Sequence, residues 1–217
     1  MTATADLRHE YALACQGFAR IAGVDEAGRG AWAGPVVAGA VILPLDRFDL
    51  AHTLRGVNDS KQLTPAERQA LLPVIVETAV AVGVGHTAQD EIDALGIVPA
   101  TRRAMQRALA ALAVAPDALL IDGLALPALA LPCLAMDKGD QQSLSIAAAS
   151  IVAKVTRDRF MDSLDEVFPQ YGFREHKGYG TPLHQAALRH FGPCAAHRLT
   201  FAPVRALLSG AKEQPAP

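Results

Sequence analysis

Short hydrophobic runs separated by polar turns dominate the first two thirds of the chain, and they predict β-strands. Each run is rich in Val, Ile, Leu or Ala, which is typical of strands that are buried on both faces. A glycine-rich turn follows the first run, so the first two strands are expected to be antiparallel neighbours. The predicted strands cover residues 21–25, 35–43, 80–85, 118–122 and 132–136.

Helical patterns fill most of the chain between and after these runs. Thr64-Pro65-Ala66-Glu67 is a capping box with proline at the first helical position, so a helix should start there and end near Ala79. A long helix that begins with small residues is expected next to the sheet, because small side chains allow close packing. The other predicted helices cover about 89–95, 99–113, 142–167, a segment starting at 181–182, and 203–208.

The order of these elements predicts an α/β fold with a mixed sheet that is flanked by helices. A purely parallel, doubly wound sheet is the competing interpretation. The chain has no G-x-G-x-x-G after a strand and no G-x-x-x-x-G-K-[ST] loop, which argues against dinucleotide and P-loop nucleotide binding. With 51% hydrophobic and 19% charged residues, the 217-residue chain is typical of a folded domain.

Other broad classes are disfavoured by what the sequence lacks. No uncharged apolar stretch reaches the roughly 18 to 20 residues of a membrane span, and residues 1–7 lack the apolar region of a signal peptide. Cys15, Cys133 and Cys194 are too widely spaced to indicate a disulfide framework or a C-x-x-C metal site. We expect a cytoplasmic protein without membrane contact, with an N-terminal segment at 1–17 and a disordered tail at 209–217.

Net charge gives an ambiguous indication of the partner. The total of −2 argues against a general polyanion coat protein, although a nuclease needs acidic residues of its own. Residues 150–205 contain eight Lys and Arg against five Asp and Glu. This excess fits either ordinary fluctuation or a surface that faces a polyanion.

Acidic residues occur at the ends of three predicted elements. Asp25-Glu26 closes the first strand, Asp122 ends the fourth, and Asp137 and Asp140 flank a strand-to-helix junction. Each has an ordinary alternative, as a solvated turn, an Asp-Gly turn or a helix cap. Because neighbouring strand residues point to opposite faces, Asp25 and Glu26 share one site only if the strand ends or bulges there.

A convergence of these carboxylates would require a cation to offset their repulsion. Oxygen ligands favour Mg²⁺ or Mn²⁺ over Zn²⁺. Two such cations held between carboxylates suit in-line cleavage of a phosphodiester. Spacing alone leaves Asp137 and Asp140 as alternatives for the third position.

Several residues are candidates for contact with a substrate. Gly28-Arg29-Gly30 exposes backbone N–H groups that a ligand can approach, unless it is a plain tight turn. Lys61, Lys154 and Arg157 are candidate phosphate contacts or ordinary surface charges, and helical spacing puts the last two on one face. Tyr179 lies between glycines, where its ring could stack on a sugar or base or belong to a hinge loop.

The chain resembles the bacterial type 2 ribonucleases H, the ribonuclease HII family. The motifs occur in the order of that family and span roughly residues 20–200. One departure is Leu124, where many relatives have a polar residue. The motifs that carry the resemblance are Gly23-Val24-Asp25-Glu26-Ala27-Gly28-Arg29-Gly30, Gly34-Pro35-Val36-Val37-Ala38, Asn58-Asp59-Ser60-Lys61, Ile121-Asp122-Gly123, Lys138-Gly139-Asp140, the run 145–158 and the run 176–181.

This resemblance implies an RNase H-like fold with a five-stranded mixed sheet, in one catalytic domain at 18–208 with a small helical part from about 170. It implies Mg²⁺- or Mn²⁺-dependent cleavage of the RNA strand in RNA–DNA hybrids. It also implies incision at ribonucleotides embedded in duplex DNA, with 3′-hydroxyl and 5′-phosphate ends. We expect the enzyme to act as a monomer.

The resemblance also assigns roles to individual residues. It implies that Asp25, Glu26, Asp122 and Asp140 are the catalytic, metal-binding carboxylates, and so it favours Asp140 over Asp137. Gly28-Arg29-Gly30 matches the segment that reads the ribonucleotide 2′-hydroxyl. Tyr179 matches the tyrosine that recognises the RNA–DNA junction.

Two rival functions make different predictions. Another RNase H-like nuclease or strand-transfer enzyme, such as a junction resolvase or a transposase core, would share the carboxylates but not Gly28-Arg29-Gly30 and Tyr179 in these contexts. A module that binds hybrids without cutting them would not need all four carboxylates. Metal-dependent cleavage of duplexes with and without ribonucleotides separates these functions.

Overall fold

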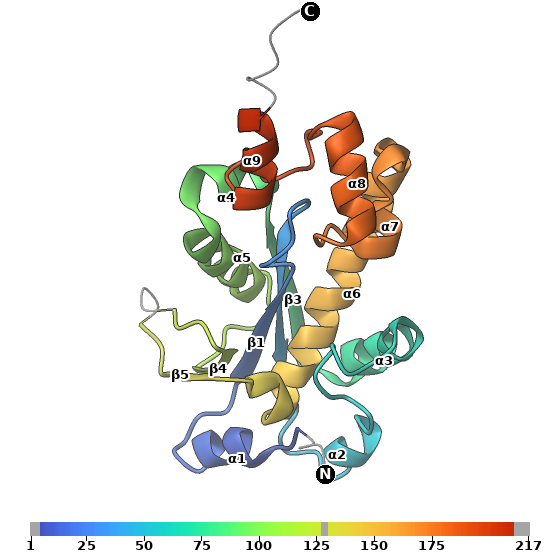
Figure 1. Ribbon diagram of the computed structural model, residues 1–217. Coiled ribbons are helices and arrows are strands. Elements are labelled where there is room, and N and C mark those ends of the chain that lie inside the picture. Colours follow the sequence, from blue (N-terminus) through green and yellow to red (C-terminus); the bar gives the residue numbers. More distant parts are fainter. Residues whose placement is uncertain (1–4, 127–129, 211–217) are drawn as a thin grey trace, which may run out of the picture.

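A five-stranded mixed sheet forms the centre of the protein in a computed structural model that describes residues 5–126 and 130–210 (Figure 1). The strand order is β3-β2-β1-β4-β5, with antiparallel pairs among the first three strands and parallel pairs from β1 to β5. The prediction of a mixed sheet is therefore confirmed. The strands are β1 Ile21–Ala27, β2 Val36–Ile42, β3 Ala81–Thr87, β4 Ala118–Asp122 and β5 Cys133–Met136.

Two helices cover the opposite faces of this sheet. Helix α6 (Leu144–Val167) packs on β1 and β2, and α5 (Ile97–Ala110) packs on β2 and β3 from the other side (Figure 1). Glycines in the strands allow the close approach. A Cβ at Gly39 would lie 2.5 Å from the Ala149 carbonyl of α6, and one at Gly85 would lie 2.2 Å from the Ala104 carbonyl of α5.

The remaining helices surround the sheet at its two ends. The predicted capping box begins α3, where the Glu67 carboxylate accepts from the Thr64 N–H and the Thr64 hydroxyl accepts from the Glu67 N–H. The helices other than α5 and α6 are α1 Arg8–Ala14, α2 Leu50–Thr53, α3 Pro65–Thr78, α4 Gln89–Leu95, α7 Phe173–His176, α8 Pro182–Phe191 and α9 Ala202–Gly210, with 3₁₀ turns η1 Gly139–Gln141 and η2 Pro169–Tyr171.

Some boundaries differ from the prediction. Helix α1 lies inside the N-terminal segment for which no helix was expected, and α5 begins two residues early. Helix α9 continues to Gly210, so the first two residues of the expected disordered tail are helical, and 211–217 lie outside the described residues. Helix α6 is capped by the Ser143 hydroxyl, which accepts from Ile146 N at 3.2 Å, and not by either aspartate.

The C-terminal helices pack around a second small core beyond one end of the sheet, at the top of Figure 1. The Trp32 N–H donates to the Gly178 carbonyl at 2.8 Å, which ties the loop that carries Tyr179 to the segment after β1. Within residues 5–126 and 130–210, no helix combines the length and hydropathy that a membrane span needs. The buried members of the core are Ala33, Met161, Tyr171, Phe173, Ala187, Leu188, Ala196 and Val204.

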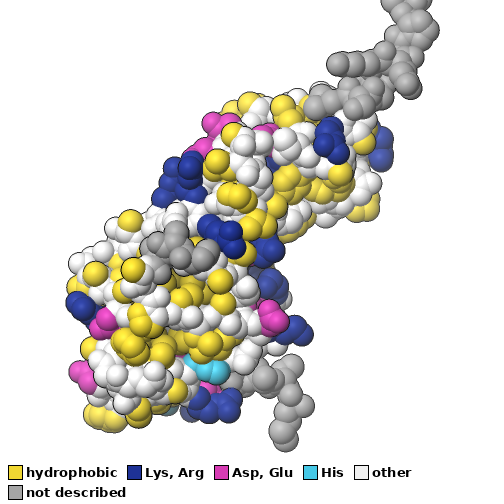
Figure 2. All heavy atoms as spheres, turned by 90° about the vertical axis from the view of Figure 1, so that its left-hand side faces the viewer, with side chains coloured by type: hydrophobic (Ala, Val, Ile, Leu, Met, Phe, Trp, Pro, Cys, Tyr) yellow, Lys and Arg dark blue, Asp and Glu magenta, His cyan; other side chains and the backbone are white. Residues whose placement is uncertain are grey.

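Figure 2 turns the left-hand side of Figure 1 toward the viewer. On this face, Lys and Arg side chains are scattered among hydrophobic ones and acidic side chains are interspersed (Figure 2). Strand β5 is the edge of the sheet, and its Leu134 is exposed. The charge on this face is therefore mixed, without a continuous basic surface among the described residues (Figure 2).

Candidate active site

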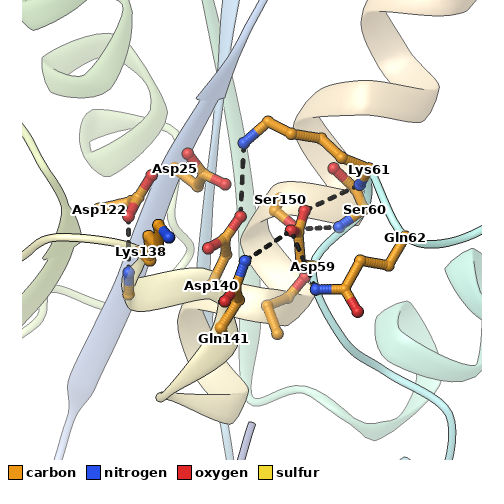
Figure 3. A network of polar contacts seen from close by, with 12 residues as sticks. Asp25, Asp59, Ser60, Lys61, Gln62, Asp122, Lys138, Asp140, Gln141 and Ser150 are labelled. Carbon is orange, nitrogen blue, oxygen red and sulfur yellow. Dashed lines mark hydrogen bonds and ion pairs between the residues drawn. The ribbon is translucent and has the colours of Figure 1, made fainter. Parts of the chain in front are cut away.

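Three carboxylates converge at the edge of the sheet where β1 and β4 end. Asp25 comes from β1, Asp122 is the last residue of β4, and Asp140 lies in η1 (Figure 3). One oxygen from each lies within 4.8 Å of the others. Because β1 and β4 are parallel neighbours, their carboxyl ends meet at the same edge. Asp140, and not Asp137, belongs to this group.

Hydrogen bonds hold each carboxylate in place. The Gly139 N–H donates to Asp122 Oδ1 at 2.6 Å, which fastens the η1 turn to the end of β4. Asp25 Oδ1 accepts from the backbone N–H of Glu26, also at 2.6 Å. Lys61 Nζ approaches Asp140 Oδ2 at 3.5 Å from the loop before α3 (Figure 3).

Burial and mutual repulsion raise the pKa values of these carboxyl groups. The pKa of Asp25 lies well above its usual value because the group is buried, and Glu26, Asp122 and Asp140 add repulsion. The pKa of Asp140 is raised to about 6, mainly by burial and also by repulsion from Asp122 and Asp59. Three hard oxygen donors that repel one another in a buried place fit a divalent cation.

Glu26 follows Asp25 on β1, and its side chain lies beside the carboxylate cluster although its backbone position belongs to the other face of the strand. The strand stays regular through Ala27, with Asp25 opposite Gly39 and Glu26 opposite Ala38, so it neither ends nor bulges at these two residues. Burial raises the pKa of Glu26, and Arg29 opposes that rise from 3.4 Å. Glu26 Oε2 is buried and has no hydrogen-bond partner among the described residues. An unpaired buried carboxylate oxygen beside the cluster fits a cation as its partner.

A cavity of about 200 Å³ opens beside the carboxylates. Nine of the predicted site residues line it, so residues far apart in the sequence lie together at one place. Ser60 and Ala27 complete the lining. The nine are Asp25, Glu26, Gly28, Arg29, Gly30, Lys61, Asp122, Lys154 and Tyr179.

Arg157 does not fit its predicted role as a phosphate contact. Its side chain is fully buried, and the guanidinium donates to the carbonyl oxygens of Pro35, Ala33 and Lys177 at 3.1, 3.2 and 2.9 Å. The charge lies 5.3 Å from the centre of the Tyr179 ring. Arg157 therefore supports the residues around the cavity from within, and the prediction of direct contact is wrong.

Arg198 is a second buried arginine, and the sequence analysis missed it. Its guanidinium donates to the carbonyls of Gly28, Arg29 and Gly34 at 2.8, 3.0 and 3.0 Å. Its pKa is lowered to about 9, mainly by burial and also by the nearby Arg157 charge. Arg198 fixes the glycine turn from 170 positions away, and no local pattern could indicate this.

Tyr179 and Lys154 contribute different groups to the cavity. Tyr179 is 38% exposed, so one part of its ring is accessible. Lys154 is half-buried, and its Nζ lies 2.6 Å from Asp158 Oδ1. Burial lowers the pKa of Lys154, and Asp158 opposes this. Lys154 thus lines the cavity with its charge paired to Asp158. Lys61, which approaches Asp140, is largely exposed.

Asp59 is another residue that the sequence did not single out. Its carboxylate is buried and accepts from the Lys61 N–H at 2.8 Å and from Gln141 Nε2 at 3.1 Å (Figure 3). It thereby joins the loop before α3 to the η1 turn. The motif Asn58-Asp59-Ser60-Lys61 was the available signal, but it did not indicate which member does the joining.

Comparison of the sequence with known proteins identifies its relatives. A sequence model of the family described as Ribonuclease HII matches residues 22–204. The ribonuclease HII of Chloroflexus aurantiacus is 55% identical over 205 residues, which is 94% of this chain and 97% of that protein.

Solved structures show the same fold. The ribonuclease H2 from Pyrococcus horikoshii OT3 matches with a TM-score of 0.74 and 26% identity, covering 90% of this chain and 100% of that one. Bst-RNase HIII, whose structure is in complex with Mn²⁺, matches with a TM-score of 0.69 and 22% identity over 90% of this chain and 71% of that one.

Proposed function

The chain belongs to the ribonuclease HII family, and from that premise we propose how its site selects and cuts its substrate. The protein is an endoribonuclease that acts on RNA–DNA hybrids. We propose that it also incises duplex DNA at embedded ribonucleotides and leaves 3′-hydroxyl and 5′-phosphate ends. One observation carries this proposal: three carboxylates within 4.8 Å lie beside a cavity that Gly28-Arg29-Gly30 and Tyr179 also line.

The metal ligands in this proposal are Asp25, Asp122 and Asp140, with Glu26 contributing from the other face of β1. Their hard oxygen donors suit Mg²⁺ or Mn²⁺. When bound, a divalent cation supplies a Lewis acid that activates water and stabilises charge on the scissile phosphate. Lys61, 3.5 Å from Asp140, holds that carboxylate and faces the substrate side.

Other residues orient the nucleic acid. A Cβ at Gly30 would meet no atom within 4 Å, so the backbone there is open to a ribose 2′-hydroxyl. Arg198 holds the carbonyls of Gly28 and Arg29 in place for this contact. The exposed part of the Tyr179 ring stacks on the sugar at the junction, while Lys61 and Lys154 contact phosphates.

We further propose that the protein is cytoplasmic, that it is a monomer, and that residues 18–208 form one catalytic domain. Light scattering of the purified protein, which measures its mass in solution, would test whether it is a monomer. Family membership disfavours both rival functions, strand transfer and hybrid binding without cleavage. The proposal would place specificity in the cavity lining, because the carboxylates themselves suit any phosphodiester.

Three end-labelled duplexes test the proposed function: an RNA–DNA hybrid, a DNA duplex with one ribonucleotide, and the same duplex without it. Each is incubated with Mg²⁺, with Mn²⁺ or with EDTA. We expect cleavage of the first two only, and only with a cation. Asp122→Asn keeps the shape of the side chain but loses the charge, so cleavage should fall by about a thousandfold or more. Near-normal cutting by this variant at saturating Mg²⁺ would remove Asp122 from the site.

A further inference from the structure

Glu10 of α1 is a completely buried carboxylate in a segment that precedes the residues matched by the family. Its Oε1 accepts three hydrogen bonds, from Ser143 Oγ at 2.7 Å, Ser145 N at 2.8 Å and Ser145 Oγ at 2.7 Å. Its Oε2 is buried too and has no partner in the part of the chain that the structure describes. A carboxylate so far from water depends strongly on these three donors.

The donors begin α6, directly after the η1 turn that carries Asp140. The Ser143 N–H donates to the Gly139 carbonyl at 2.8 Å, and the Ser143 hydroxyl caps the helix at Ile146 N. A negative charge at the N-terminus of this 24-residue helix also interacts favourably with the helix dipole. Glu10 therefore holds the junction between η1 and α6.

The neighbouring backbone strengthens this attachment. Asp6 forms an isolated parallel bridge with Ser143, and the Leu144 N–H donates to the Asp6 carbonyl at 2.8 Å. On the other side, a Cβ at Gly23 would lie 2.1 Å from the Ser145 carbonyl carbon. The first turn of α6 is thus held between the N-terminal segment and β1, two residues before Asp25.

We infer that Glu10 is a positioning residue for the metal site, because it fixes the η1–α6 junction and so keeps Asp140 in range of Asp25 and Asp122. This inference rests on the proposed role of those three carboxylates as ligands. Helix α1 then supports the active site, whereas the prediction from the sequence placed residues 1–17 outside the catalytic domain. Glu10 acts through Asp140 and does not touch the substrate.

Direct binding of Mn²⁺ to the full chain without nucleic acid tests the inference, with free Mn²⁺ measured by electron paramagnetic resonance. Loss of a residue that orients a metal ligand commonly weakens affinity about 10- to 100-fold. Because Glu10 acts one layer further out, we expect Glu10→Ala to raise the Kd about three- to tenfold. Glu10→Gln keeps the size but loses the charge, so it should have a smaller effect. Excess Mn²⁺ should restore most of kcat for the hybrid without changing KM.

Ile92→Ala is the matched control, because Ile92 is fully buried in the core on the α5 side of the sheet and is remote from η1. It should lower Tm while leaving the Kd for Mn²⁺ unchanged. Ser145→Ala removes two of the donors, and its effect on the Kd should not add to that of Glu10→Gln. This pair also serves if Glu10→Ala does not fold.

Two outcomes separate the inference from the function beneath it. Wild-type Mn²⁺ affinity in Glu10→Gln and Ser145→Ala, or a Kd change no larger than in an equally destabilised Ile92→Ala, would overturn the role of Glu10. If the wild type bound no Mn²⁺, or Asp122→Asn bound it as well as the wild type, the proposed metal site itself would fail.

Discussion

Tyr179 is the residue whose contribution can be separated most cleanly from metal binding. It lines the cavity with the carboxylates but offers a ring, and stacking of a base or sugar on an aromatic ring contributes about 1 to 3 kcal/mol. We expect Tyr179→Ala to lower cleavage efficiency at a single ribonucleotide by roughly ten- to a hundredfold. The Kd for Mn²⁺ should stay the same.

Tyr179→Phe separates the ring from the hydroxyl in the same assay. If stacking carries the effect, the phenylalanine variant should cut the single-ribonucleotide duplex like the wild type. Wild-type rates in both variants would show that Tyr179 has no part in recognising the junction.

Individual residues differ in how well the sequence indicated them. Asp25, Asp122 and Asp140 stand at or next to the ends of elements predicted from the sequence, where a one-dimensional pattern can point to a site, and the structure brings them together. Arg157 and Arg198 look like ordinary charges in the sequence. Their roles depend on backbone carbonyls brought near by the fold, so only the three-dimensional structure could identify them.

At the scale of elements, the turn after β1 requires glycine at one position and tolerates a side chain at another. Gly28 has φ +90°, and a Cβ there would lie 1.8 Å from Arg157 Nε, whereas a Cβ at Gly30 would meet nothing within 4 Å. Gly28→Ala should destabilise the protein by about 1 to 3 kcal/mol, or roughly 3 to 10 °C in Tm. Differential scanning calorimetry measures this loss.

Gly30→Ala is the control in the same turn. It should keep the wild-type Tm, because its methyl group meets no neighbour. It should nevertheless reduce cleavage at a ribonucleotide, because the methyl group would occupy space that the 2′-hydroxyl needs. Equal Tm losses in both variants would contradict the account of the turn.

The histidines of the C-terminal helices predict a loss of stability in acid. His184 Nδ1 donates to the Tyr179 carbonyl, so its Nε2 accepts from His197 Nε2 at 3.0 Å, and His197 Nδ1 accepts from Cys194 N. Both rings are therefore neutral, and burial lowers both pKa values to about 4. Between pH 6.5 and 4 the unfolded chain binds more protons, so the stability falls as the pH falls.

Urea unfolding at pH 7.5 and pH 5 measures this effect. The free energy of unfolding should be lower at pH 5 by about 2 to 4 kcal/mol from the two rings. The buried carboxyl groups with raised pKa values contribute with the opposite sign. The same measurement on His197→Gln contains the same carboxyl contribution, so the difference between the variant and the wild type reports the histidines alone. If the variant lost as much stability between pH 7.5 and pH 5 as the wild type, the histidine pair would be excluded as the source of the loss.

Elements with local signals were predicted best. The signal for each of these elements lies within its own residues: the capping box of α3, the apolar runs of β1 to β4 and the small residues of α6. Helix α1 has no such signal. Its stability depends on burying Glu10 against serines more than 130 positions away, which a local pattern cannot reveal.

For the molecule as a whole, we expect the cations that line the cavity to determine how binding depends on salt. With Arg157 buried, Arg29, Lys61 and Lys154 remain to meet phosphates. About three neutralised phosphates give a log–log slope of the binding constant against salt near −3. Fluorescence anisotropy with Asp122→Asn measures binding without cleavage.

Lys154→Ala provides the check on this count. It should make the slope less steep by about one, because one fewer phosphate is neutralised. A salt response that is flat in the parent protein would rule out phosphate contacts by these cations.

Arg157 and Arg198, the two arginines that are fully buried, carry positive charges without an acidic partner in the described part of the chain. Carbonyl oxygens take up their hydrogens, but neither forms an ion pair with a carboxylate among the described residues. Neutral acceptors leave two positive charges beneath the turn at 28–35, each held by three hydrogen bonds to backbone carbonyls. The phosphates of a nucleic acid lying over that turn would act as counter-ions for these two charges. The two arginines would then be neutralised by the substrate and not by an acidic side chain of the protein.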